Sequence, residues 1–93
     1  MPLETTRFDI QEYLKTPEQQ VAYIEAALDE DDPAFLAKAL GEVARARGMT
    51  QVAKDAGVTR EALYRALSEK GDPRLSTLMG VMRALGLKLR IAA

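Results

Sequence analysis

The sequence predicts a single all-α domain of five to six helices, followed by a short C-terminal β-strand. Its length of 93 residues is that of one domain. Between residues 10 and 85 apolar side chains recur at intervals of three and four, which is the spacing of helices with one buried face. After residue 86 they alternate with charged residues, which is the period of a half-buried strand.

The composition restricts the possible functions. The chain has no cysteine and no histidine, so it cannot form a disulfide, a thiolate zinc site or an imidazole-based catalytic pair. We therefore expect no catalytic residues, no metal and no other cofactor, and a protein that is not an enzyme. The first ten residues have neither a basic start nor an apolar stretch, and no apolar run reaches the roughly 18–20 residues of a membrane span. These features predict a cytoplasmic protein.

Two proline-containing pairs predict the starts of the two longest helices. In Thr16–Pro17 and Asp32–Pro33 the first residue can cap the helix, and proline suits its first position. A shorter helix over 9–14 precedes them, and Gly48 is a stop signal for the second long helix. The acidic run at 29–32 lacks the ligand spacing of a calcium loop, so we interpret it as a solvated helix end.

Residues 49–68 divide into two short helices. Thr50 and Thr59 are expected to cap them, and Gly57 supplies the sharp turn between them. After a Gly-Asp-Pro turn at 71–73, the last helix continues to residue 86. We therefore divide the single domain 1–93 into an acidic extension with helices (1–32), a helical core (33–86) and the strand (87–92).

The spacing within 49–68 is that of a helix-turn-helix. Ala53 allows the helices to cross closely, and Gly57 lies four residues later at the turn, while Val58 and Leu63 fill the space between the helices. In this geometry the second helix can enter a DNA major groove. The residues predicted to contact DNA are Thr50, Gln51, Thr59, Arg60, Glu61, Tyr64, Arg65 and Ser68.

These predicted contact residues have different expected roles. Arg60 and Arg65 can bond to guanine, and Glu61 can accept a hydrogen bond from cytosine. Thr50 and Gln51 lie at the start of the first helix, where they can hold a phosphate. In the alternative interpretation the charged residues only solvate a surface helix, in which Arg65 pairs with Glu61 four residues earlier.

Charge is distributed unevenly along the chain. Residues 1–41 carry nine acidic and three basic side chains, whereas residues 42–93 carry five acidic and ten basic ones. The net charge of −1 therefore conceals a basic half that can bind phosphate, because local potential decides what a surface attracts. In the alternative interpretation both halves are solvated surfaces without a charged partner.

The predicted strand needs a partner, because a lone strand leaves its backbone donors and acceptors unpaired. The partner is either the N-terminal segment 3–8 or the same strand of a second subunit. In the second case the alternating apolar side chains form a dimer interface, which consists of Leu87, Leu89 and Ile91.

Four segments carry a resemblance to a known family: DPAFLAKALG at 32–41, ARARGM at 44–49, GVTREALYRALS at 57–68 and TLMGVMRALGL at 77–87. Through them the sequence, from about residue 8 to residue 91, resembles the addiction module antidote family of short HigA-like antitoxins with an XRE/Cro-type helix-turn-helix. One departure concerns Gln51, which stands two residues before Ala53. The wider XRE pattern has its glutamine further from the alanine, so this departure implies a shorter first helix.

The resemblance implies a lambda-repressor-like domain that forms a homodimer, binds double-stranded operator DNA and represses its own operon. It also implies a cognate RelE/HigB-like toxin, encoded beside it, whose ribonuclease activity the antitoxin blocks. We expect residues 1–32 to dock this toxin, taken as basic, while residues 42–93 hold DNA. The alternatives are a stand-alone XRE/Cro-type transcriptional regulator without a toxin partner, and a protein-interaction module whose helix pair only packs.

Overall fold

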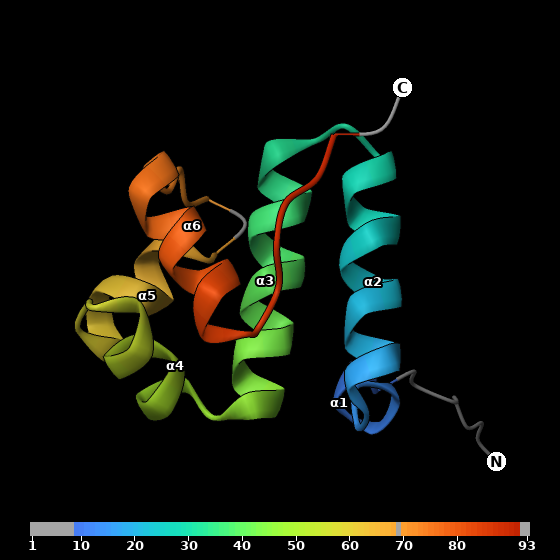
Figure 1. Cartoon of the computed structure of the whole chain (residues 1–93), viewed down its shortest axis with the longest axis horizontal. Coiled ribbons are helices and arrows are strands. Elements are labelled where there is room, and N and C mark those ends of the chain that lie inside the picture. The colour runs from blue at the N-terminus through green and yellow to red at the C-terminus, as the bar shows by residue number, and fades with distance from the viewer. Residues whose placement is uncertain (1–8, 69, 92–93) are drawn as a thin grey trace, which may run out of the picture.

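The computed structural model describes residues 9–68 and 70–91, and in these residues it contains six helices and no strand (Figure 1). The predicted all-α class is therefore confirmed. Helices α2 and α3 run side by side, and α4, α5 and α6 gather on the other side of α3. No helix in the described residues is long and apolar enough to cross a membrane. The helices are α1 (Ile10–Tyr13), α2 (Pro17–Asp29), α3 (Pro33–Arg47), α4 (Met49–Ala56), α5 (Arg60–Ala66) and α6 (Leu75–Ala84).

The predicted caps of the two long helices are confirmed. Thr16 Oγ1 accepts from the Gln19 backbone N–H at 3.1 Å, and Gln19 Oε1 accepts from the Thr16 N–H at 3.0 Å. This reciprocal capping box satisfies donors that a helix start otherwise leaves free. Asp32 accepts from the Ala34 N–H at 3.0 Å, so the last carboxylate of the acidic run caps α3.

The hydrophobic core lies where α3 meets α4, α5 and α6. Leu40 and Val43 of α3, Leu63 of α5 and Val81 of α6 are fully buried. From the other side α2 contributes Ile24 to the same cluster. Burial of each such side chain stabilises the fold by about 1.5–3 kcal/mol. The seven-residue α5 is therefore held by packing, since so short a helix is not stable alone.

Arg47 joins three parts of the fold through hydrogen bonds. Its Nε donates to Gln20 Oε1 of α2 at 2.6 Å, and its Nη2 donates to the Leu85 carbonyl, after α6, at 3.1 Å. The buried Gln20 in turn donates to the Leu14 carbonyl at 3.2 Å. A basic residue in the last turn of a helix also suits the negative end of the helix dipole. In this fold Arg47 additionally fixes α2 and the end of α6 to α3.

The turn between α4 and α5 follows the prediction. Gly57 has a φ of +78° and ends α4, and this left-handed conformation costs glycine nothing sterically. Thr59 caps α5 by accepting from the Ala62 N–H at 3.0 Å. The two short helices are thus joined by the three residues 57–59.

The predicted cap of α4 is wrong. Gly48 rather than Thr50 occupies the N-cap position, and no side chain in the described part of the chain caps this helix. The reason is that α4 begins at Met49, whose side chain is buried in the core. This anchor places Thr50 in the first turn, where its side chain is exposed.

The prediction of a strand at 87–92 is wrong for the described part of this single chain. The Leu87 N–H donates to the Met82 carbonyl at 2.8 Å, which closes the turn after α6. Residues 88–91 make no backbone hydrogen bond to other described residues, and a strand requires a neighbouring strand. The N-terminal candidate, 3–8, lies outside the described residues. The tail, defined as residues 87–91, runs along α3 towards the α2–α3 turn (Figure 1).

Candidate nucleic-acid interface

Helix α5 turns one side to the core and the other to the surface. Leu63 and Leu67 are buried, and the burial of Leu63 agrees with its predicted place between the two helices. Ser68 is half-buried and donates its hydroxyl to the Arg65 carbonyl at 3.1 Å, so it is less available than predicted. Thr59 remains exposed, although its hydroxyl caps the helix. The exposed residues of α5 itself are Arg60, Glu61, Tyr64 and Arg65.

The ion pair of the alternative interpretation is not present. The two ion pairs among the described residues join Lys15 to Glu12 and Arg45 to Glu42. Glu61 and Arg65, although one helical turn apart, do not pair. Neither charged group forms an ion pair with a described residue, although the Glu61 carboxylate acts electrostatically on the neighbouring Arg60.

Tyr64 is the centre of a cluster with two arginines. The guanidinium carbon of Arg60 lies 5.5 Å from the centre of the Tyr64 ring, and that of Arg45, which comes from α3, lies 5.7 Å from it. Both distances are within the range of cation–π attraction. Arg60 also donates to the Tyr64 hydroxyl at 3.4 Å, and this bond raises the pKa of the Arg60 guanidinium above its ordinary value. Arg60 therefore stays charged.

Arg45 was not among the residues predicted to contact DNA. It lies in the last turn of α3 and donates to Glu42 Oε1 at 3.0 Å. Its approach to Tyr64 depends on how α3 packs against the α4–α5 pair, which spacing along the sequence does not encode. The one local signal is its position three residues before Gly48, where α3 gives way to α4.

An open groove of about 520 Å³ lies between this cluster and the start of α4. The first N–H groups of α4 have no side-chain cap there, and a helix N-terminus favours negative charge. The Gln51 amide donates to Asp55 at 2.9 Å, so it is directed partly along its own helix. The groove suits a singly charged anion such as a phosphodiester. It brings together four of the predicted residues, Thr50, Gln51, Arg60 and Tyr64, with the unpredicted Arg45.

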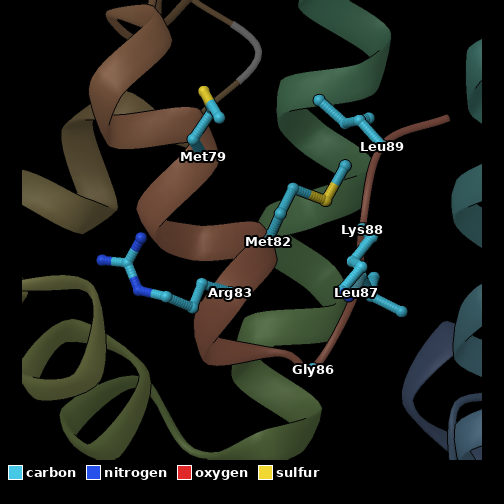
Figure 2. A pocket seen from close by; sticks show the side chains of 7 residues that line it. All are labelled: Met79, Met82, Arg83, Gly86, Leu87, Lys88 and Leu89. Carbon is cyan, nitrogen blue, oxygen red and sulfur yellow. The ribbon is translucent and has the colours of Figure 1, made fainter.

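A second groove of about 520 Å³ lies between α6 and the tail. Met82 of α6 and Leu89 of the tail extend into the space between them (Figure 2). Of the three predicted dimer residues, Leu87 packs against the core, whereas Leu89 and Ile91 are exposed. This groove is therefore mainly apolar, in contrast to the basic groove beside α4.

The fold and the grooves together define a small all-α protein in which a short helix presents an exposed, basic surface. Residues 4–93 match the model of a family described as "probable addiction module antidote protein". The chain belongs to this family, for which a toxin is the general kind of partner. It is 45% identical over 84 residues to an uncharacterized protein of Haemophilus influenzae, covering 90% of this chain and 87% of that protein. No solved structure gives a significant match.

Proposed function

We propose that the chain is a DNA-binding antitoxin of a type II toxin–antitoxin module, which acts by binding rather than by catalysis. In this proposal it neutralises a RelE/HigB-like toxin and represses its own operon. The observation that carries the proposal is the exposed arginine-bearing side of α5 beside the basic groove, in a chain that belongs to an antidote family.

The α4–α5 pair acts in this proposal as a helix-turn-helix of the XRE/Cro type. Helix α5 enters the major groove, where its arginines face the DNA: Arg65 bonds to guanine, Arg60 bonds to guanine or to the adjacent backbone, and Glu61 accepts from cytosine. The start of α4, with Thr50 and Gln51, faces the phosphate backbone and sets the register without reading sequence.

A homodimer is the proposed DNA-binding form. One short reading helix contacts few base pairs, so two copies are expected on half-sites about 34–36 Å apart. The exposed apolar side chains of Leu89 and Ile91, beside the groove between α6 and the tail, supply the proposed contact between the two copies. Their burial removes apolar surface from water.

The acidic side of the chain is the proposed docking surface for a basic toxin. Helix α2 and the turn after it carry carboxylates that are exposed and form no ion pair with described residues. They lie on the other side of α3 from α5, so the protein can bind a toxin and DNA at the same time. These carboxylates are Glu18, Glu25, Asp29, Glu30 and Asp31.

The test is co-expression with the product of the adjacent gene, followed by gel shifts of the complex on DNA from upstream of the operon. We expect co-purification, and binding whose log affinity falls linearly with log salt. Arg60→Ala with Arg65→Ala is expected to abolish operator binding but not toxin neutralisation. Glu25→Lys with Asp29→Lys is expected to do the reverse.

Two results would redirect this proposal. Operator binding without any toxin encoded nearby would favour a stand-alone XRE/Cro-type regulator. Undiminished operator affinity in the double arginine variant would contradict the proposed role of α5. We test the acidic side by substitution rather than by deletion, because α2 contributes Ile24 to the core.

A further inference from the structure

We propose that Arg45 and Arg60 form a two-arginine clamp on one phosphate of the DNA backbone, and that Tyr64 positions both arginines. The proposal rests on the proposed DNA-binding function. It adds to that function a residue of α3, outside the α4–α5 pair. It also places Arg60 on the phosphate backbone rather than on a guanine, which leaves Arg65 as the arginine that contacts a base, and it gives Tyr64 a positioning role.

The first argument is the geometry of the cluster. Two guanidinium groups repel one another, yet Arg45 and Arg60 both lie within 6 Å of the same ring centre, at 5.7 and 5.5 Å. The negative face of an aromatic ring offsets part of this repulsion. Tyr64 therefore holds two cations close together before any ligand arrives, which reduces the entropy lost on binding.

The second argument is the balance of charge and donors. Glu42 neutralises Arg45 through a 3.0 Å contact, whereas Arg60 has no ion pair with a described residue. Arg60 is thus the guanidinium available to a single negative charge such as that of a phosphodiester, since its neighbour Glu61 acts on it electrostatically without forming an ion pair. A guanidinium has five N–H donors, and the hydrogen bonds to Glu42 and Tyr64 each use one. The remaining donors can bind phosphate oxygens in a fork.

The third argument is the position of the clamp. Both arginines line the groove at the start of α4, where uncapped N–H groups also favour an anion. The groove lies directly beside Tyr64 and the exposed side of α5. When α5 enters a major groove, the adjacent phosphate backbone is the anion nearest to this position.

The test measures binding to duplex DNA by fluorescence anisotropy at several salt concentrations, with the upstream operator and a random duplex of equal length. Each neutralised phosphate contributes about 0.9 to the slope of log affinity against log salt concentration. At 0.15 M salt the loss of one such contact therefore lowers the affinity about fivefold for each protomer. For a dimer we expect Arg45→Ala to weaken binding about 30-fold on both duplexes, and to lower the salt slope by about 2. Toxin neutralisation is expected to be unchanged.

Lys38→Ala is the matched control for Arg45→Ala. It removes one positive charge from an exposed side chain of the same helix, seven residues or about 10 Å earlier. We expect this variant to leave the affinity and the salt slope unchanged. An equal loss in Lys38→Ala would mean that overall charge, not a clamp, holds the DNA, and would overturn the proposal.

The role of Tyr64 is tested by two substitutions. Tyr64→Phe keeps the ring and is expected to bind within about twofold of the wild type, whereas Tyr64→Leu removes the ring and is expected to lose most of the affinity that Arg45→Ala loses. If Tyr64→Phe loses as much as Tyr64→Leu, the hydroxyl itself contacts DNA and the positioning role is wrong. Thermal unfolding of each variant verifies that the fold is intact.

Failure of the clamp and failure of the proposed function give different results. If the wild type binds neither duplex at low salt, the proposed DNA-binding function and the clamp are both wrong. If the wild type binds the operator but Arg45→Ala changes neither affinity nor slope, only the clamp is wrong. Arg45→Lys keeps the positive charge but not the planar guanidinium with its forked donors. A DNA affinity between those of the wild type and Arg45→Ala supports a site that needs both.

Discussion

The hydrogen bonds of Arg47 predict that this residue contributes to stability more than an exposed arginine usually does. Arg47→Met keeps the aliphatic stem but removes the bonds to Gln20 at 2.6 Å and to the Leu85 carbonyl at 3.1 Å. Both acceptors belong to buried residues, since Gln20 is 6% and Leu85 3% exposed. A buried acceptor without a donor costs about 1–3 kcal/mol. We therefore expect Arg47→Met to lower the free energy of unfolding by about 2 kcal/mol.

The assay is urea denaturation combined with thermal unfolding. For a chain of this size 2 kcal/mol corresponds to a fall in Tm of about 8–16 °C.

A double-mutant cycle with Gln20→Met isolates the interaction between Arg47 and Gln20, because the double variant removes both partners of their hydrogen bond and leaves neither one unsatisfied. We expect the double variant to be at least about 1 kcal/mol more stable than the sum of the single effects predicts. Arg83→Met, at an exposed site on α6, is the control and is expected to change stability by less than about 0.5 kcal/mol. Additivity within about 0.5 kcal/mol would refute the coupling between Arg47 and Gln20.

Three further predictions concern the fold. Leu63→Ala removes a fully buried side chain from α5 and should cost about 2–5 kcal/mol in urea denaturation; a cost below about 1 kcal/mol would show that α5 is not anchored by this residue. Gly57→Ala places a side chain at φ +78° and should lower the free energy of unfolding, measured by urea denaturation, by about 1–2 kcal/mol. Gly57→Asn should lower it less, because asparagine tolerates the left-handed conformation better than alanine. Burial, and to a lesser extent the Glu42 carboxylate, raises the pKa of the Tyr23 phenol. The unfolded chain therefore ionises at a lower pH than the folded one, and stability should be lost as pH rises above about 10. In Tyr23→Phe this loss should be smaller, and an identical pH profile would argue against the raised pKa.

Local signals in the sequence predict the helix starts because the atoms that satisfy them are close along the chain. Thr16, Asp32 and Thr59 each bind a backbone N–H two or three residues later. Thr50 satisfies the same local rule, yet it is not a cap. The burial of Met49 in the core moves the start of α4 two residues towards the N-terminus, with Gly48 rather than Thr50 as its N-cap, and a contact with distant residues cannot be read from a cap pattern.

The tail shows a different limit of the sequence. Alternating apolar residues predict which side chains share a face, and Leu87 does pack against the core. Alternation does not specify a hydrogen-bonding neighbour, so it cannot distinguish a strand from an extended segment that lies over helices.

The candidate site was predictable only in part. The exposed side of α5 follows from the period of its buried residues. The cluster of Arg45, Tyr64 and Arg60 does not, because Arg45 reaches Tyr64 only through the packing of α3 against α4 and α5. Arg47 is a similar case, since its partners lie 27 and 38 residues away along the chain.

Gly48 ends α3 and starts α4 as a single residue. Its N–H donates to the Ala44 carbonyl at 2.8 Å, and its own carbonyl accepts from the Val52 N–H at 3.1 Å. The direction of α4 relative to α3 therefore depends on the two backbone torsions of Gly48, because no other residue separates the two helices. A longer linker at this joint would let the α4–α5 pair rotate relative to α2 and α3. The one-residue joint therefore helps to keep the surface proposed to bind DNA and the acidic surface proposed to bind a toxin in a constant relative orientation.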